Sequence, residues 1–185
     1  MGELIQCSPI AATIVFALAM YGGALAPQSR EGTPLVEFQR GADAYAFLHR
    51  QAERQIGMAH RRAGLPVEEI ASHTLAEKII TMRGNDSSQV LFTPAAAAAL
   101  RELAARAART PGCNPGELRS GVWVTAYKAN ASATGTNSIS DCIAAALPAL
   151  PEELQYRSAG TVLVLVDTHA NLVVDVLPAL LIGQR

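Results

Sequence analysis

The chain has 185 residues, with 15 lysines and arginines against 16 aspartates and glutamates, and a formal net charge of −1. This length suits one ordinary domain, which can bury its own core without a structural metal. Neither half is strongly basic, and a surface that follows a phosphate backbone needs clustered positive charge, so we expect no nucleic-acid partner.

The N-terminal segment from Ile10 to Ala26 contains no charged residue. Such a run predicts a signal peptide or a membrane anchor within residues 1–26, followed by a polar linker over residues 27–35. The residues before the run include Glu3 and no basic side chain, and Pro27 follows its small-residue cleavage motif, so cleavage and anchoring both stay open. We expect an exported protein, periplasmic or secreted, or alternatively a membrane-anchored one. Membrane contact is expected only through residues 10–26, and only if they are not cleaved.

Three helices are predicted in the first half of the remaining chain. Apolar residues at three- and four-residue steps indicate a helix over residues 36–63 and a second one over about residues 66–83. The third, over about residues 94–110, has Thr93 as its N-cap and Pro94 at its first position. The segments end at Gly64-Leu65-Pro66, at the polar turn Gly84–Ser87 and at Pro111-Gly112.

The second half is predicted to be rich in β-structure. The run VWVTAY indicates a strand over residues 122–127, and the polar stretch 128–137 indicates a flexible loop. Ser140 is placed to cap a short helix over residues 141–147. Turns of hairpin length then separate three predicted strands, over residues 154–157, 162–167 and 172–176.

These elements predict a single α+β domain over residues 36–185. Its helical part covers residues 36–110, and its β-rich part covers residues 111–185. The three C-terminal strands are expected to form an antiparallel three-stranded meander that the helices cover.

Cysteine usage fits export. Removal of residues 1–26 removes Cys7 and leaves only Cys113 and Cys142. In an oxidising compartment these two predict a disulfide, which would stabilise the domain by about 3–4 kcal/mol in the chain-entropy model. Two free buried thiols are the alternative.

One acid in the last predicted strand needs a partner. A four-residue hairpin loop places Asp167 opposite Leu172 and Val164 opposite Asp175. Asp175 lies among valines, and a buried charge without a partner is very costly. We predict a structural ion pair with Arg157 of the neighbouring strand; simple exposure of the acid is the alternative.

Catalytic residues stay unknown, and four side chains are the candidates: His49, Glu53, Asp167 and His169. Short polar side chains around Asp167 and His169 are typical of a turn that bonds to its own backbone. His49 and Glu53 lie one turn apart on the first helix and could bind Zn²⁺. A third ligand, His73 or His169, would have to come from another part of the chain. We therefore predict no metal site and no cofactor.

The chain resembles a family of uncharacterised bacterial exported proteins. The matching segments are Leu147–Arg157 and Leu163–Leu181, and weaker matches are Tyr45–Glu53 and Leu91–Leu103. Members of this family look like a signal peptide followed by one small domain. The resemblance implies export and a single domain, and it implies no activity and no catalytic residue.

The sequence carries no phosphate-binding glycine loop, no metalloprotease or nucleophile-elbow motif and no paired-cysteine metal motif. We therefore expect a non-enzymatic periplasmic or secreted domain that binds or interacts with an unidentified partner, a protein or an envelope component. One alternative is a small hydrolase with an unrecognised site at His49 and Glu53 or at Asp167 and His169. Another is an envelope component that the N-terminal helix anchors.

Overall fold

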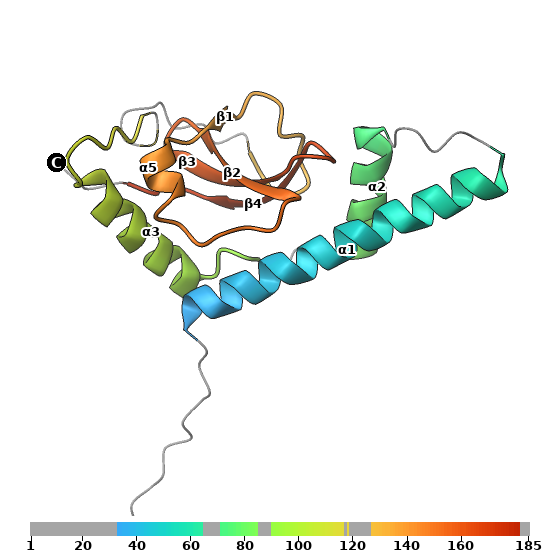
Figure 1. Ribbon diagram of the computed structural model, residues 1–185, viewed down its shortest axis with the longest axis horizontal. Helices are drawn as coiled ribbons and strands as arrows, with labels where there is room; N and C mark the ends of the chain where they lie inside the picture. The colour runs from blue at the N-terminus through green and yellow to red at the C-terminus, as the bar shows by residue number, and fades with distance from the viewer. Residues whose placement is uncertain (1–32, 65–70, 85–89, 117, 119–126, 182–185) are drawn as a thin grey trace, which may run out of the picture. The chain divides into compact units, whose positions relative to one another are not determined.

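The computed structural model describes residues 33–64, 71–84, 90–116, 118 and 127–181, which all belong to one compact unit, Glu31–Arg185. Its described helices are α1 (Pro34–Arg62), α2 (Ser72–Arg83), α3 (Pro94–Ala108) and the short α5 (Asp141–Ala144). Four strands form one antiparallel sheet in chain order, β1 (Asn137–Ser138), β2 (Leu154–Ala159), β3 (Val162–Asp167) and β4 (Leu172–Leu177). The fold class is α+β, as predicted (Figure 1).

Local sequence explains the helix starts. Both α1 and α3 begin with a Thr-Pro pair, and Thr93 Oγ1 accepts a hydrogen bond from the backbone N–H of Ala96 at 3.2 Å. A proline at the first helical position has a suitable φ and lacks a donor that would be unpaired there. The second helix begins at Ser72, later than the predicted start at residue 66, and residues 65–70 lie outside the described part.

The predicted count of three strands and about three helices is wrong for the described chain, which has four strands and four helices. The additional strand, β1, has only two residues and pairs with β2 at the edge of the sheet. Two residues are too few to show the alternation that identifies a strand in a sequence. The short helix α5 ends earlier than the predicted residue 147. Residues 122–126 of the predicted first strand lie outside the described residues.

The segment 128–137 is bonded to the sheet, although a flexible loop was predicted. The Asn130 backbone N–H donates to the Val173 carbonyl at 2.8 Å, and the Val173 N–H donates to the Ala131 carbonyl at 2.8 Å. Ala133 packs into an apolar cluster on the sheet. The segment therefore pairs with the outer edge of β4, which would otherwise present unpaired backbone groups.

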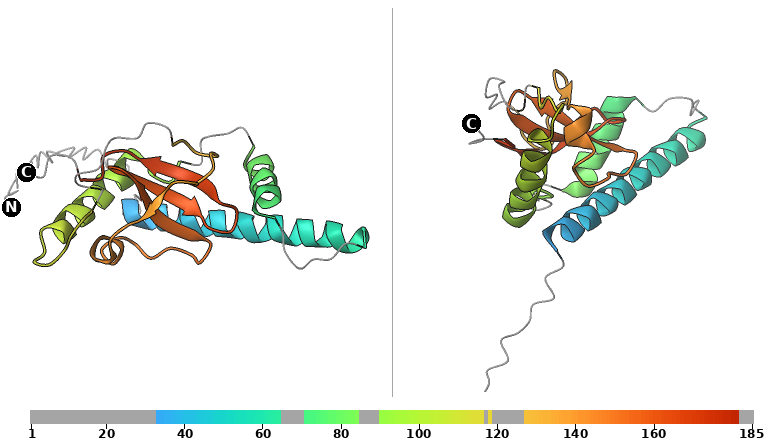
Figure 2. Two further views of the ribbon diagram at one scale, coloured as in Figure 1. Left: turned by 90° about the horizontal axis from the view of Figure 1, so that it is seen from above. Right: turned by 60° about the vertical axis from the view of Figure 1, so that its left-hand side comes forward.

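The two faces of the sheet bury different residues. Along β3, the side chains of Leu163, Leu165 and Asp167 point to the side where α1 packs. The alternating valines point to the other side: Val162, Val164 and Val166. This alternation is the period of two that any strand has. Helix α1 also contacts α2 and α3, and it runs along one face of the sheet (Figures 1 and 2).

A β-bulge changes the register of the last hairpin. Asp167 pairs with Leu172 as predicted, but Asp175 pairs with Leu165 and not with Val164. The register shift leaves Val174 as an additional residue in β4, and such a residue turns the following side chains to the opposite face. Asp175 consequently faces the helices.

The predicted ion pair between Arg157 and Asp175 is wrong. Arg157 lies opposite Val164 on the face away from α1, and β3 separates β2 from β4. The carboxylate of Asp175 instead accepts a hydrogen bond from the Phe92 backbone N–H at 2.7 Å. This bond fixes the chain that leads into α3 against the sheet.

A disulfide joins Cys113 and Cys142, with a Cα–Cα distance of 5.6 Å, as the sequence predicted. The two cysteines lie beyond the end of α3 and within α5, and these helices contact one another. Because 29 positions separate the cysteines, the bond closes a long stretch of chain between the end of α3 and α5.

The predicted export segment, residues 1–26, lies outside the described residues, as does most of the predicted linker, 27–35. None of the described helices combines the length and the apolar character that a membrane span requires. The division of residues 36–185 into a helical and a β-rich part stays a prediction for the segments that are not described.

Candidate metal centre

One face of α1 carries three polar side chains at four-residue steps. Tyr45, His49 and Glu53 lie above one another because residues four apart share a helix face. Tyr45 and His49 are buried, with 3% and 0% exposure, whereas the Glu53 side chain is 39% exposed. The row therefore leads from the core to the surface.

Asp167 lies opposite this row and is fully buried. Its Oδ2 accepts hydrogen bonds from the Tyr45 hydroxyl at 2.8 Å and from His49 Nδ1 at 2.6 Å. Its Oδ1 accepts from the backbone N–H groups of His169 at 3.1 Å and Ala170 at 2.8 Å. A buried carboxylate is tolerated when its oxygens are satisfied, and all four of these bonds serve that purpose.

Asp167 fixes the chemical state of both α1 partners. Burial raises the pKa of Tyr45 far above its usual range, and the charge of Asp167 and its hydrogen bond raise it further, so the hydroxyl stays a donor. Burial alone lowers the pKa of His49, but the hydrogen bond and charge of Asp167, with the charge of Glu53, outweigh it and raise the pKa. Because the carboxylate accepts, Nδ1 carries a hydrogen and Nε2 faces away from Asp167.

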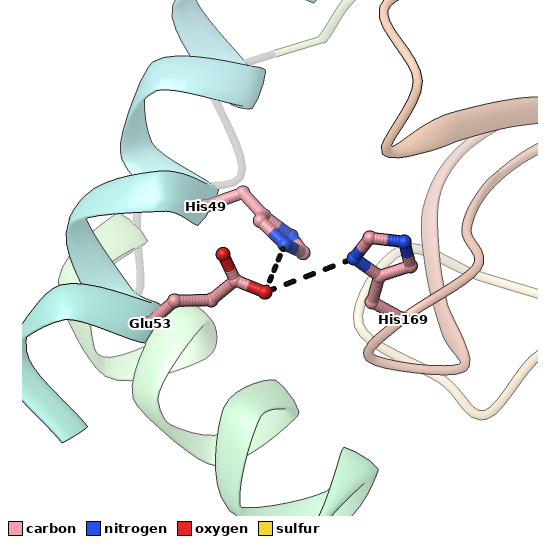
Figure 3. A group of neighbouring side chains, drawn as sticks. All are labelled: His49, Glu53 and His169. Atoms are coloured by element: carbon pink, nitrogen blue, oxygen red, sulfur yellow. Dashed lines mark ion pairs between the residues drawn. The ribbon is translucent and has the colours of Figure 1, made fainter. Parts of the chain in front are cut away.

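The hairpin between β3 and β4 brings His169 to the same place. His169 Nδ1 lies 3.7 Å from Glu53 Oε1, and His49 Nε2 lies 3.2 Å from that oxygen (Figure 3). The two imidazole rings meet edge to face, with centroids 5.3 Å apart. The His169 side chain is 51% exposed, so this end of the cluster opens to solvent.

The three side chains have the spacing of a metal site. One ligand atom from each of His49, Glu53 and His169 lies within 4.8 Å of the others. Ligands about 2.0–2.1 Å from a tetrahedral zinc ion are about 3.3 Å apart, close to the 3.2 Å and 3.7 Å found here.

Two further observations favour a cation in this cluster. His49 Nε2 is buried and lies 3.2 Å from Glu53 Oε1, so the nitrogen and the carboxylate face one another as two ligands of one ion would. The bond from His49 to Asp167 reproduces the carboxylate–histidine–metal arrangement that orients ligands in metalloproteins. Asp167 also holds the backbone of His169, so one buried side chain positions both histidines.

A second ion pair supports the hairpin from the side. Arg50 Nη1 donates to Glu153 Oε1 at 2.6 Å, and Glu153 is 2% exposed. The Glu153 carbonyl also accepts a hydrogen bond from the Thr168 N–H at 3.0 Å. These contacts tie α1 and the start of β2 to the turn that carries His169.

The cluster lacks the partner that nucleophilic catalysis would need. Among the described residues, no serine, threonine or cysteine side chain hydrogen-bonds to His49. The His49–Asp167 pair therefore does not belong to a hydrolytic triad within the described chain, which needs a hydroxyl or thiol next to the imidazole.

The structure brings all four candidate residues together: His49, Glu53, Asp167 and His169. His73 is not part of the cluster. The sequence predicted that Asp167 bonds to the backbone of its own turn, and this prediction describes only half of its role. One carboxylate oxygen bonds the turn, and the other bonds side chains of α1. The sequence prediction missed Tyr45 as a partner, and the alternation of β3 was the signal that could have placed Asp167 toward α1.

Comparisons with protein-family models, with curated proteins and with solved structures found no significant match for this chain.

Proposed function

We propose that this protein binds a divalent transition-metal ion of the zinc class through His49, Glu53 and His169. The observation that carries the proposal is the convergence of three ligand groups, because one ligand atom each of the buried His49, of Glu53 and of His169 lies within 4.8 Å of the others. Asp167 supports this role because it keeps the hydrogen on Nδ1 and leaves Nε2 free to coordinate.

The donor set decides which metals suit the site. Two imidazole nitrogens and one carboxylate oxygen fit Zn²⁺ and its neighbours in the first transition row, whereas Ca²⁺ and Mg²⁺ prefer oxygen ligands alone. The carboxylates of Glu53 and Asp167 give the cluster the negative charge that attracts a cation. We therefore expect zinc to bind far more tightly than magnesium.

Export is part of the proposal. The uncharged segment 10–26, the family resemblance and the disulfide between Cys113 and Cys142 support a periplasmic or secreted location, because disulfides persist in oxidising compartments. In this proposal the domain captures or holds metal outside the cytoplasm. An uncleaved N-terminal segment would make the same domain an anchored envelope component.

The exposure of the cluster favours a second candidate function, a metal-dependent hydrolase. Three protein ligands with a fourth position open to solvent are typical of catalytic zinc, which lowers the pKa of a bound water. Glu53 and His169 are 39% and 51% exposed, so water and a substrate can reach this side. The test is hydrolysis of ester and phosphoester substrates by the zinc-loaded chain, which His169→Ala should abolish and His73→Ala should leave unchanged.

Calorimetric titration of the metal-free chain with Zn²⁺ tests the proposed site. We expect one ion per chain, and an affinity at least about a hundredfold lower in His169→Ala and Glu53→Gln, because each loses a ligand. Both side chains are partly exposed, so the fold should survive the changes. His73→Ala is the matched control, since His73 is an exposed histidine outside the cluster.

Three results would count against the proposal. These are the absence of saturable zinc binding, equal binding in both ligand variants and the parent chain, and a loss in His73→Ala as large as in His169→Ala.

A further inference from the structure

A second buried polar group in this domain has no acidic partner. Arg83, the last residue of α2, is 8% exposed. Its Nη1 donates to Asn130 Oδ1 at 3.0 Å, and its Nη2 donates to the Val174 carbonyl at 3.4 Å. Its Nε has no hydrogen-bond partner, and no carboxylate of the described residues forms an ion pair with it.

This arrangement leaves a positive charge in the core. A buried charge is costly unless an opposite charge or a full set of hydrogen bonds compensates for it. The ring of Tyr45, 5.6 Å from the guanidinium carbon, compensates in part through a cation–π contact. Within the part of the chain that the structure describes, the Nε N–H and the net charge still lack a partner.

Arg83 lines a pocket whose other walls are mainly apolar. The pocket has a volume of about 290 Å³ and is lined by Gly41, Ala44, Tyr45, Leu48, Arg83, Val90 and Leu91. Leu91 closes it tightly against α1, because a Cβ atom at Gly41 would lie 2.4 Å from Leu91 Cδ2. If each atom takes the ~30 Å³ of a water molecule, the pocket holds about ten non-hydrogen atoms.

The pocket has a charged end and an open end. Arg83 and Tyr45 are buried, whereas Ala44 and Val90 are exposed. A ligand would therefore place its anionic group against Arg83 and its apolar body toward Ala44 and Val90. Pockets that bind small molecules commonly combine apolar walls with one such charged anchor.

We propose that this pocket binds a small organic monocarboxylate with an apolar body. The planar guanidinium of arginine suits a carboxylate, and Arg83 is the charged residue among those that line this pocket. The site is separate from the metal cluster, since it shares none of the three proposed metal ligands.

Calorimetric titration of the full-length, metal-free chain with octanoate tests the inference, in the presence of a chelator so that the metal cluster cannot hold the carboxylate. We expect one octanoate per chain. Acetate, which lacks the apolar body, and 1-octanol, which lacks the charge, should each bind at least about tenfold more weakly.

Two variants change opposite ends of the pocket. Arg83→Met keeps the length of the side chain and removes the charge, and Ala44→Phe fills the open end from an exposed position of α1. Both should weaken octanoate binding by about tenfold or more. If Arg83→Met does not fold, Ala44→Phe alone decides, because its position lies outside the core.

Two further variants are controls that should bind octanoate like the parent chain. Arg40→Met removes an exposed arginine of α1, the helix that carries Ala44. His169→Ala removes a proposed metal ligand. The inference is overturned if octanoate does not bind, if 1-octanol binds equally well, or if Ala44→Phe leaves octanoate binding unchanged. Because the metal is absent throughout, the result does not depend on the proposed zinc site.

Discussion

At the scale of single residues, Asp167 organises the candidate metal centre. Its two oxygens face different parts of the chain: one bonds Tyr45 and His49 of α1, and the other bonds the backbone of the turn that carries His169. The side chain of His49 and the backbone of His169 are both bonded to this carboxylate. Asp167 is buried and is not one of the three proposed ligands, yet it positions both histidine ligands.

The change Asp167→Asn tests this role. An amide has one acceptor oxygen where the carboxylate has two, so a buried donor among its partners must lose its bond, at a cost of about 1–3 kcal/mol. We expect the free energy of unfolding in urea, measured without metal, to fall by this amount. Zinc affinity should fall about 10- to 100-fold, as for other changes to the partner of a metal ligand.

Asp43→Asn is the matched control for Asp167→Asn, since Asp43 is an exposed acid of α1. It should change neither stability nor zinc affinity. Asp167→Asn with the stability and zinc affinity of the parent chain would contradict the account of this residue.

At the scale of elements, the β-bulge in β4 decides which face Asp175 occupies. Asp167 points to the helices through the regular alternation of β3, and Asp175 points there because it follows the bulge. In a regular hairpin Asp175 would lie opposite Val164, on the face that Arg157 shares. The bulge thus replaces an ion pair within the sheet by a bond from Asp175 to the chain entering α3.

A double-mutant cycle between Asp175→Ala and Arg157→Met checks this arrangement. Asp175→Ala alone should cost about 1–3 kcal/mol, because the Phe92 N–H is left without its acceptor. The coupling between the two changes should stay below about 0.5 kcal/mol, as for residues without a shared partner. Urea unfolding of the four chains measures it, and a coupling well above 1 kcal/mol would mean that the two residues do pair.

The elements differ in how far the sequence predicts them. The apolar stripes locate α1 and α3, the Thr93-Pro94 pair locates the start of α3, and the turn residues locate the strands β2 to β4. The sequence does not predict the bulge. Valines flank Asp175 on both sides and suit either face of the sheet, so no interruption of an apolar–polar alternation marks the additional residue. The two-residue strand β1 carries no pattern at all.

The candidate site likewise has a part that the sequence predicts and a part that it does not. The four-residue spacing of His49 and Glu53 is a local property that the sequence shows directly. The arrival of His169 is not local, because 116 positions separate it from Glu53 and only the packing of β3 on α1 brings it there. The sequence therefore predicted a two-ligand fragment and no metal site.

At the scale of the whole molecule, the disulfide joins the segment that follows α3 to the short helix α5. It closes a loop across a separation of 29 positions, which corresponds to a stabilisation of about 3–4 kcal/mol in the chain-entropy model. The chain with both cysteines replaced by serine should unfold at a correspondingly lower urea concentration. The parent chain in reductant is the control and should match the variant, whereas equal stability of the oxidised parent and the variant would contradict this role.

The central claim is that one metal ion lies between α1 and the β3–β4 hairpin. Anomalous scattering at the zinc absorption edge, from crystals of the full chain grown with Zn²⁺, tests it most directly. We predict one peak about 2.0–2.2 Å from His49 Nε2, Glu53 Oε1 and His169 Nδ1, which is absent in His169→Ala. Zinc peaks at other side chains, with none between these three, would contradict the claim.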